Sequence, residues 1–402
     1  MDSHARTITA AQLVDGVAHL ASAGAYATVV DPVLIVDLDQ ADETLAAVAA
    51  SRVAMLDQLV IGRSSQPIPP SLAPLVAALD LTYAPSAHTG GGWRLGKGHD
   101  RADDAGAGRA HDPAGSAVPS MSMPATQGAY APEMTVDRAI VSVTDVDAAL
   151  LEFVETAARN PQAALIAGQV LRISETLPIP QAIDVESLAY STLQGGAEFR
   201  GWLDARRGLG RPLPPPPAAD PVLIDRDGRT LRITLNRPER RNAYGTAVRD
   251  ALVEALRIAL VDDTVAKVVL SGAGPCFCAG GDLDEFGHAP DHATAHFIRT
   301  RGGAARSMAR LAHRMRVDLH GQCVGAGIEI PAFAHCVVAT PDTVFRLPEV
   351  SMGLIPGAGG TVSIPRRIGR WRALHLFVTG AALDASRALD WGLVDEVASS
   401  RP

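Results

Sequence analysis

The chain has 402 residues, of which 47% are hydrophobic and 20% are charged. That length is enough for two domains, and that composition is typical of a globular protein with an ample apolar core. The net charge of −8 argues against a basic surface for nucleic acid, and the sequence holds no apolar run long enough for a membrane-spanning helix.

The first residues and two of the cysteines indicate the compartment. Residues 1–6 lack the basic start and the long apolar run of a signal peptide, so we expect a cytoplasmic protein. Cys276 and Cys278 are separated by one residue in an apolar stretch, with no histidine beside them at ligand spacing. This pattern favours buried free thiols in a reducing compartment over a metal site.

Residues 1–83 show the periodicities of an α/β region. Helical patterns cover residues 10–23 and 41–59, and short apolar runs at 33–37 and 59–62 predict strands. Strands that alternate with helices in this way are typical of an α/β fold.

The composition changes after this first region. Residues 84–133 are rich in Gly, Ala, Ser, His, Asp and Pro, and cannot bury enough apolar surface to offset the entropy of ordering them. We therefore expect a flexible low-complexity linker there. Residues 134–210 regain amphipathic patterns, with predicted helices at 145–158, 161–174 and 184–207. This stretch is predicted to be a helical cap or assembly module.

A proline-rich segment over residues 211–220 marks the start of the second half. Its four consecutive prolines, 214–217, favour polyproline II and make a semi-rigid spacer. In residues 221–402 strands alternate with helices, which predicts an α/β architecture. The predicted strands are 222–225, 230–235, 266–271, 316–320 and 336–339, and the predicted helices are 244–260, 294–313 and 326–334.

Three segments of the second half carry residues suited to binding and catalysis. They are residues 233–243, with an Asn-Arg-Pro turn, residues 277–283, with a Gly-Gly pair, and residues 320–330, with small residues before a glutamate. Small residues let a ligand approach the main chain closely. An N–H group in the first turn of a helix, such as that of Ala326, also favours negative charge on a bound group.

Two glutamates lie 20 residues apart in and after the third segment. Glu329 sits in an apolar helical stretch, and Glu349 follows Leu-Pro and precedes the glycine-rich run 353–361. An unpaired buried carboxylate is costly, so each glutamate needs a reason to be there. One reason is an ion pair with an arginine such as Arg346 or Arg314. The other is catalysis, because two carboxylates that face one pocket push their pKa values apart and so provide an acid and a base.

In their order and spacing these segments resemble the crotonase superfamily of enoyl-CoA hydratases and isomerases. The resemblance implies a crotonase-like ββα spiral for the C-terminal half, within the α/β class. It also implies that the backbone N–H groups of Gly281 and Ala326 form an oxyanion hole for the thioester oxygen, worth about 3–4 kcal/mol per donor. Glu329 is then the base that activates water, and Glu349 delivers a proton.

The same resemblance implies the substrate and the reaction. The chain is expected to be an enoyl-CoA hydratase, a carbon–oxygen lyase of fatty acid metabolism that adds water across the 2,3 double bond of a trans-2-enoyl-CoA. No metal or other cofactor is expected, since coenzyme A enters as part of the substrate. The residues expected along the acyl-CoA are Arg241, Ala243, Ala279, Gly281, Asp282, Leu283, Asp284 and Ala326.

The resemblance also bears on assembly and leaves alternatives. We expect a homo-oligomer, a trimer or a hexamer, without a nucleic-acid or membrane partner. An enoyl-CoA isomerase and an acyl-CoA hydrolase of the same superfamily are alternative enzymes. A third alternative is a non-catalytic CoA-binding assembly subunit, against which the costly pair of glutamates argues. Arg346 is expected to reach the acyl pocket or to contact a polar substrate.

Two segments upstream of the proline-rich spacer resemble the helices that close a crotonase domain. They are residues 157–164 and 186–207, whereas in relatives these helices follow the position of Val397. The N-terminal half therefore resembles either a decayed first copy of the fold or a cap supplied from upstream, as in a permutation. We expect a combination, a degenerate and non-catalytic copy whose helices at 145–207 pack onto the C-terminal core.

Overall fold

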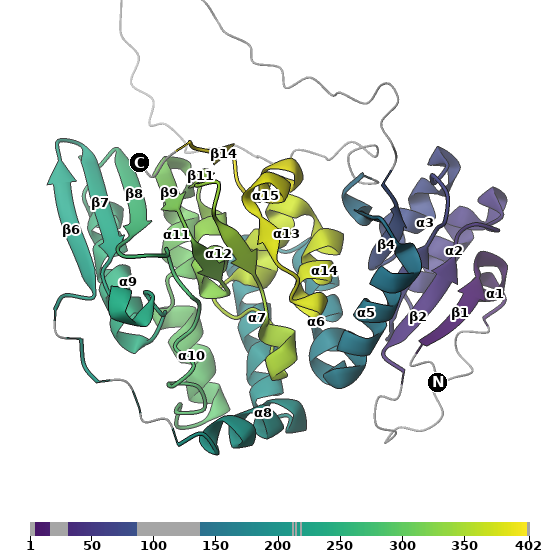
Figure 1. The fold of residues 1–402 in the computed structure, drawn as a ribbon, viewed down its shortest axis with the longest axis horizontal. Coiled ribbons are helices and arrows are strands. Elements are labelled where there is room, and N and C mark those ends of the chain that lie inside the picture. Colours follow the sequence, from purple (N-terminus) through teal and green to yellow (C-terminus); the bar gives the residue numbers. More distant parts are fainter. Residues whose placement is uncertain are drawn as a thin grey trace, which may run out of the picture.

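A computed structural model describes residues 5–16, 31–86, 137–210, 213, 215–217 and 219–399. Figure 1 shows the N-terminal sheet (purple) at one end of the molecule and the strands β6, β7 and β8 of the C-terminal core at the other, with α6 and α7 (teal) and α13 and α14 (yellow) between them. Most of the linker predicted over 84–133 lies outside the described residues. Its first two residues, Ala84 and Pro85, belong to a strand, so that boundary was placed too early.

The N-terminal sheet has five parallel strands in the order β1-β2-β3-β4-β5. They are β1 (Ala5–Thr9), β2 (Val33–Asp37), β3 (Leu59–Arg63), β4 (Leu81–Pro85) and β5 (Ile140–Val143). The strands predicted at 33–37 and 59–62 are confirmed. β5 belongs to the predicted helical module, yet it pairs with β4, so the two predicted regions share one sheet.

Helices cover both faces of this sheet, which explains its continuous apolar runs. On one face lie α1 (Ala10–Val14), α2 (Ala46–Val53) and α3 (Ala73–Ala78). The opposite face packs against α5 (Val146–Arg159) and the rest of the protein. Because successive strand residues face opposite sides, Leu34 joins the first cluster and Ile35 the second. The helix predicted over 10–23 ends at Val14, and residues 17–30 lie outside the described part of the chain.

The helical module contains α6 (Pro161–Ser174), α7 (Ile179–Gln194) and α8 (Ala197–Arg207). The single helix predicted over 184–207 was wrong, because Gly195 and Gly196 separate α7 from α8. Gly196 adopts an extended backbone as the N-cap of α8, and glycine is readily accommodated at such a helix boundary. Figure 1 shows α8 turning away from α7 at the base of the molecule.

The C-terminal core is a six-stranded sheet in the order β14-β11-β9-β8-β7-β6, with a smaller sheet β10-β12-β13 beside it. Only the β6–β7 hairpin is antiparallel within the larger sheet. The strands are β6 (Val222–Asp227), β7 (Thr230–Leu235), β8 (Lys267–Gly272), β9 (Met315–Leu319), β10 (Gln322–Val324), β11 (Cys336–Ala339), β12 (Val344–Arg346), β13 (Leu383–Asp384) and β14 (Glu396–Val397).

This core contains the three predicted helices, one of them divided and one shortened, and three further helices that were not predicted. They are α9 (Thr246–Val261), α10 (His292–Gly302), α11 (Ala305–Leu311), α12 (Ala326–Glu329), α13 (Gly360–Ile368), α14 (Arg370–Thr379) and α15 (Ala385–Trp391). The helix predicted over 294–313 is divided into α10 and α11, because Gly303 has an extended backbone. Glu349 begins a short 3-10 helix, η7 (Glu349–Met352).

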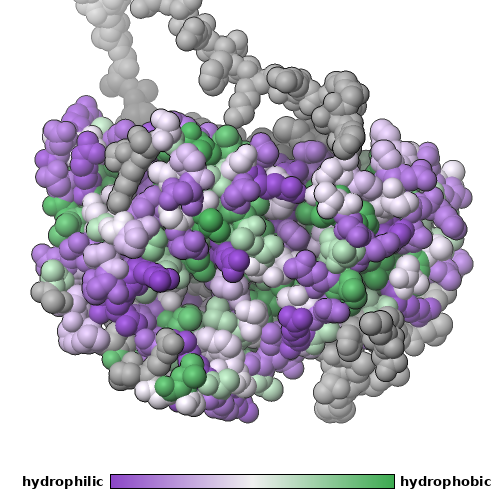
Figure 2. Space-filling view, viewed as in Figure 1, coloured by the Kyte–Doolittle hydropathy of each residue, from purple (hydrophilic) through white to green (hydrophobic). Residues whose placement is uncertain are grey.

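One apolar core runs through both halves of the chain. Tyr83, Phe153 and Ile183 from the N-terminal half share a buried cluster with Val362 and Phe377 from the C-terminal half. On the face drawn in Figure 2 hydrophilic residues predominate, and hydrophobic ones appear in small groups. The burial of apolar side chains between the halves is the main attraction that joins them.

Polar contacts fix how the halves meet. The indole Nε1 of Trp371 in α14 donates to the carbonyl of Leu79 at 2.9 Å, and the Tyr83 hydroxyl lies 2.8 Å from Nδ1 of His375. Both sheets keep their parallel strands in chain order. A shared strand order is expected of a shrunken copy, but the origin of the N-terminal half remains a prediction.

Among the described residues, the structure contains no helix whose length and apolarity would suit it to span a bilayer.

Deleting residues 1–210 should leave an insoluble or unfolded fragment. The deletion exposes the side of the core that α6 and α7 cover, including Val362, and removes the partner of Trp371. Expression of residues 211–402, followed by size-exclusion chromatography and circular dichroism, tests this. A monodisperse fragment that melts at the temperature of the whole chain would contradict it.

Candidate active site

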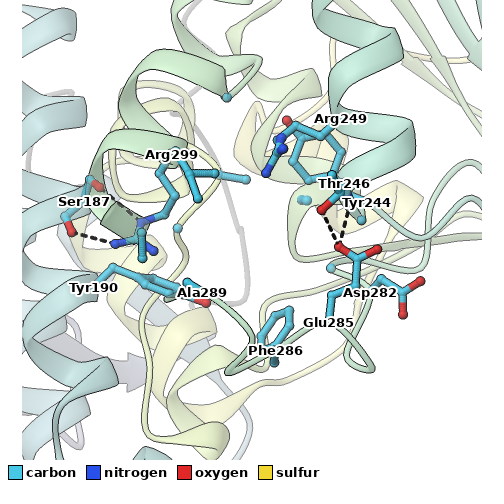
Figure 3. Close-up of a pocket in the computed structure, with 18 of the residues that line it drawn as sticks. Ser187, Tyr190, Tyr244, Thr246, Arg249, Asp282, Glu285, Phe286, Ala289 and Arg299 are labelled. Atoms are coloured by element: carbon cyan, nitrogen blue, oxygen red, sulfur yellow. Dashed lines mark hydrogen bonds between the residues drawn. The ribbon is translucent and has the colours of Figure 1, made fainter. Parts of the chain in front are cut away.

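A cavity of about 590 Å³ lies where α7 faces the C-terminal core. In Figure 3 Ser187, Tyr190 and Arg299 lie on one side of it, and Thr246 and Asp282 on the other. The first two residues come from the N-terminal half, and the other three come from the C-terminal half. The cavity is therefore built by both halves.

Two backbone N–H groups on the core side of this cavity are free to bind a ligand. Gly281 and Ala326 both line the cavity, and neither N–H donates a hydrogen bond to another described residue. Tyr244 holds the chain on both sides of Gly281, since it donates to Gly280 at 2.7 Å and accepts from Asp282 at 3.4 Å.

The N–H of Ala326 lies at the start of a helix. Ala326 is the first residue of α12, and Gly325 before it has a φ of +49°. Glycine tolerates this left-handed region where other residues are strained. A Cβ on Gly325 would also stand 2.4 Å from a carboxyl oxygen of Glu349. Unpaired N–H groups at a helix start favour negative charge on a bound group.

The two predicted glutamates meet at this point. Glu329 is 2% exposed and Glu349 is 8% exposed, and both line the cavity. The position of a Cβ on Gly325 is 2.4 Å from Oε1 of Glu349 and 3.6 Å from Oε1 of Glu329. The two carboxyl groups therefore face the same small space beside the N–H of Ala326.

The hydrogen bonds of the two carboxyl groups differ. Oε2 of Glu329 accepts from the N–H groups of Ala358 at 2.7 Å and Gly360 at 3.0 Å. Oε2 of Glu349 is buried without a hydrogen-bond partner among the described residues. Donors favour the ionised form of a carboxyl group, and their absence favours the protonated form.

Burial dominates the acidity of both groups. It raises the pKa of Glu349 to about 8. Burial also raises the pKa of Glu329 well above its ordinary value, and the neighbouring carboxyl groups of Glu349 and Glu186 raise it further. Because two carboxylates so close together repel each other, ionising both costs free energy, and the two groups titrate as a pair.

The alternative that these glutamates form ion pairs with arginines is wrong for the described residues. Arg314 donates instead to the carbonyls of Val265 and Ala259, both at 2.6 Å. Arg346 is exposed at the end of β12 and does not line the cavity. The expectation that Arg346 reaches the acyl pocket is therefore also wrong.

The residues predicted along the acyl-CoA divide into two groups. Gly281, Asp282 and Ala326 line the cavity, whereas five others do not: Arg241, Ala243, Ala279, Leu283 and Asp284. Arg241 is exposed and has a φ of +52°, and its carbonyl accepts from Ala279 at 3.0 Å.

The two aspartates have a structural explanation. Arg240 pairs with Asp282 at 2.6 Å and with Asp284 at 2.9 Å. Arg206 of α8 pairs with Asp284 at 2.5 Å. These ion pairs fasten α8 to the loop that carries Gly281.

Sequence reasoning missed the residues that α7 contributes to the cavity. Glu186, 2% exposed, accepts from the N–H of Gly359 at 2.7 Å and from the N–H and hydroxyl of Thr361 at 2.9 and 2.8 Å. Burial raises the pKa of Glu186 to about 7. The signal was present, because Glu186 is a carboxylate between apolar positions, as Glu329 is.

Arg299 of α10 lies beside Glu186 and ties α10 to α7. Its guanidinium donates to Ser187 Oγ at 3.1 Å, to Gln194 at 3.0 Å and to Ser191, and stacks 4.4 Å from the centre of the Tyr190 ring. Burial lowers the pKa of Arg299. No cluster of three or more potential metal-ligating side chains occurs within the described ranges.

Known proteins resemble the C-terminal half. The profile of a family described as enoyl-CoA hydratase/isomerase matches residues 226–401. A 2,3-dehydroadipyl-CoA hydratase of Escherichia coli is 33% identical over 176 residues, which cover 44% of this chain and 68% of the relative. A 1,2-epoxyphenylacetyl-CoA isomerase of the same organism is 36% identical over 172 residues, which cover 42% and 65%.

A solved enoyl-CoA hydratase from Thermoplasma volcanium is 33% identical, with a TM-score of 0.41, and the match covers 45% of this chain and 73% of that one. The chain thus spans about two thirds of the length of the curated relatives, through its C-terminal half. The matched stretch contains both glutamates and both free N–H groups of the cavity. The chain belongs to the crotonase superfamily of enoyl-CoA hydratases and isomerases.

Proposed function

We propose that this protein is an enoyl-CoA hydratase that adds water across the 2,3 double bond of a trans-2-enoyl-CoA. The observation that carries the proposal is the pair of buried carboxyl groups, Glu329 and Glu349, facing one small space beside the free N–H of Ala326. Addition of water requires a base and an acid, and such a pair supplies both from one side of the substrate.

The free N–H groups suit the thioester carbonyl. With its oxygen between the N–H groups of Gly281 and Ala326, the carbonyl draws electron density from C3 and makes that carbon electrophilic. Negative charge then develops on the oxygen in the transition state, where two preorganised donors stabilise it by about 3–4 kcal/mol each.

The two carboxyl groups take different roles in this proposal. Glu329, whose Oε2 accepts two N–H bonds, is the ionised base that removes a proton from water as the oxygen adds to C3. Glu349, whose Oε2 has no partner, holds the proton of the pair and gives it to C2. Coenzyme A enters as part of the substrate and leaves as part of the product. In this proposal residues of the chain supply the base, the acid and the two N–H donors.

An isomerase is the second candidate, and one relative bears that name. The 1,2-epoxyphenylacetyl-CoA isomerase shares 36% identity with this chain over the matched region. Isomerisation of an enoyl-CoA, unlike hydration, moves a proton between carbons and needs no bound water. Incorporation of solvent oxygen into the product distinguishes the two reactions. A cytoplasmic homo-oligomer, a trimer or hexamer, is also part of the proposal, and light scattering tests the assembly.

Glu329→Gln and Glu349→Gln should each lower kcat for crotonyl-CoA hydration by about 10²–10⁴-fold, since each removes one partner of general acid–base catalysis. KM should change little, because neither substitution removes an oxyanion N–H. Loss of the enoyl-thioester absorbance measures the rate. Glu254→Gln, an exposed glutamate of α9, is the control and should match wild type. Full activity in either site variant would contradict the assigned roles.

The pH dependence of kcat/KM should be bell-shaped. Activity should fall above about pH 8 as Glu349 loses its proton, because burial raises its pKa to about 8. Activity should also fall at low pH as Glu329 gains a proton, and this limb should lie above 4.5, the ordinary pKa of a glutamate, because the pKa of Glu329 is raised. A rate that stays constant from pH 7 to 10 would exclude a protonated Glu349 as the acid.

Glu349→Gln should stabilise the protein at high pH. The folded pKa of Glu349 lies above its unfolded value, so its contribution to stability is full below about pH 4.5 and is lost as pH rises towards 8. Glutamine does not ionise, so the melting temperature of the variant relative to wild type should increase by a few degrees between pH 5 and pH 9. A pH-independent difference, like that expected for Glu254→Gln, would show that Glu349 is not buried as a titrating acid.

A further inference from the structure

Glu186 and Glu329 hold four consecutive N–H groups in alternation. Glu329 accepts from Ala358 at 2.7 Å and Gly360 at 3.0 Å, and Glu186 accepts from Gly359 at 2.7 Å and Thr361 at 2.9 Å. The Thr361 hydroxyl also donates to Glu186 at 2.8 Å. One carboxylate comes from the C-terminal half and the other from the N-terminal half, and between them lies a single strip of backbone.

This strip is the start of α13, where N–H groups have no partners within the helix. Gly359 precedes the helix with a φ of +102°, and a Cβ on Gly360 would stand 2.7 Å from Oε2 of Glu329. The backbone therefore lies against Glu329 in a conformation that glycine permits and other residues do not. Residues 359 and 360 have no side chains to hold this strip, and the Gly359 carbonyl accepts from Val362 at 3.0 Å and from Ser363 at 2.9 Å, so its N–H groups depend on the two carboxylates.

The alternation couples the two carboxylates. Each peptide unit is planar, so turning the Gly359 N–H away from Glu186 also turns the Ala358 carbonyl and disturbs the N–H groups on either side. The Ala358 and Gly360 N–H groups keep their direction towards Glu329 only while Glu186 holds the N–H groups between and after them. Glu186 belongs to α7, which Arg299 of α10 holds through the next residue: its guanidinium donates to Ser187 Oγ at 3.1 Å and to the Ser187 carbonyl at 3.2 Å.

We propose that Glu186 is a positioning residue for the hydration reaction: it holds residues 358–361 so that their N–H groups orient Glu329 and keep it ionised as the base. The inference rests on the proposed function for its kinetic test, but the contact between Glu186 and the strip does not depend on it. Glu186, a residue of the N-terminal half, thereby affects the reaction rate through Glu329 without contacting the reacting atoms of the substrate.

Other charged groups face this pair and enter the pH dependence. Glu349 of η7 and Tyr190 of α7 face Glu329, together with the Cys278 thiol, and Arg299 of α10 faces Glu186. The negative charge of Glu186 itself raises the pKa of Glu329. Removing that charge alone should lower the pKa of Glu329, whereas releasing the N–H donors should raise it. The two effects differ in sign, so a pH profile separates them.

Glu186→Gln tests the proposal. The amide keeps one acceptor oxygen but presents an NH₂ group to the remaining N–H and hydroxyl donors, so the strip is no longer held as before. We expect kcat for crotonyl-CoA to fall about 10- to 100-fold, the usual loss when a partner that orients a catalytic group is removed, with KM little changed. The acid limb of the kcat/KM profile should move to higher pH.

Two further variants make the result specific. Thr361→Val removes only the hydroxyl bond to Glu186 and no charge, and should give a smaller loss of kcat with the same direction of shift; it also serves if Glu186→Gln does not fold. Asp184→Asn is the matched control on the same helix, because Asp184 pairs with Arg306 across the same interface at 2.5 Å but does not line the cavity. It should leave kcat and the pH profile unchanged.

Three outcomes overturn the proposal. In the first, Glu186→Gln lowers the melting temperature but leaves kcat and the acid limb as in wild type, which indicates a merely structural role. In the second, the acid limb moves to lower pH at unchanged kcat, which indicates an effect of charge alone. In the third, Asp184→Asn reproduces the kinetic defect, which indicates a general loosening of α7.

Failure of the proposed function is distinguishable from failure of this inference. If the wild type does not hydrate crotonyl-CoA, the coupling is measured by melting temperatures of Glu186→Gln, Glu329→Gln and the double variant. Shifts that do not add support the shared strip, because residues joined through one backbone element interact energetically. Additive shifts would overturn it. If the wild type is active, Glu329→Gln is inactive and Glu186→Gln is fully active, the function stands and the inference fails.

Discussion

The carboxyl groups of Glu186, Glu329 and Glu349 are all buried beside the cavity. No basic side chain among the described residues forms an ion pair with any of them. Removing a carboxylate from water costs several kcal/mol unless hydrogen bonds offset it. For Glu186 and Glu329 the main chain supplies those bonds, through the glycine-rich approach to α13 and the unpaired N–H groups at its start. The close packing of Gly325, Gly359 and Gly360 against carboxyl oxygens and a phenylalanine follows from that requirement.

The hydrogen bonds of the buried carboxylates also join the two halves of the chain, because Glu186 of α7 accepts from N–H groups at the start of α13. The C-terminal core carries the free N–H groups of Gly281 and Ala326 and the paired glutamates, but the far wall is α7. α7 is held there by Arg299 and by the common apolar core. The N-terminal sheet in turn supports α5 and α6, so a region without the catalytic motifs still determines the shape of the site.

Residues close together in sequence were the ones that the sequence predicted well. Glu329 and Glu349 stood out because each breaks an apolar or glycine-rich pattern, and their 20-residue spacing matched a known family. Glu186 breaks its pattern in the same way, but its partners lie 173 and 175 residues away, and no local rule connects them. Arg346 was misjudged because Glu349, only three residues further on, lines the cavity, whereas Arg346 itself is exposed and does not.

Secondary structure was predictable to a similar extent. The buried strands β2 and β3 were found from their apolar runs, and the glycine pair that divides α7 from α8 was overlooked because the apolar pattern continues across it. The pairing of β4 with β5 was beyond prediction, since more than fifty residues separate the two strands and only tertiary packing brings them together.

The order of the segments has a consequence for synthesis in the cell. α6 and α7 leave the ribosome before the core that covers their apolar faces has been translated, whereas a cap that follows its core emerges onto a finished surface. At roughly 5–20 residues per second, the nascent chain spends on the order of ten seconds or more with these faces uncovered. During that interval Val170, Leu171 and Ile183, all buried in the finished protein, are open to chaperones and to aggregation.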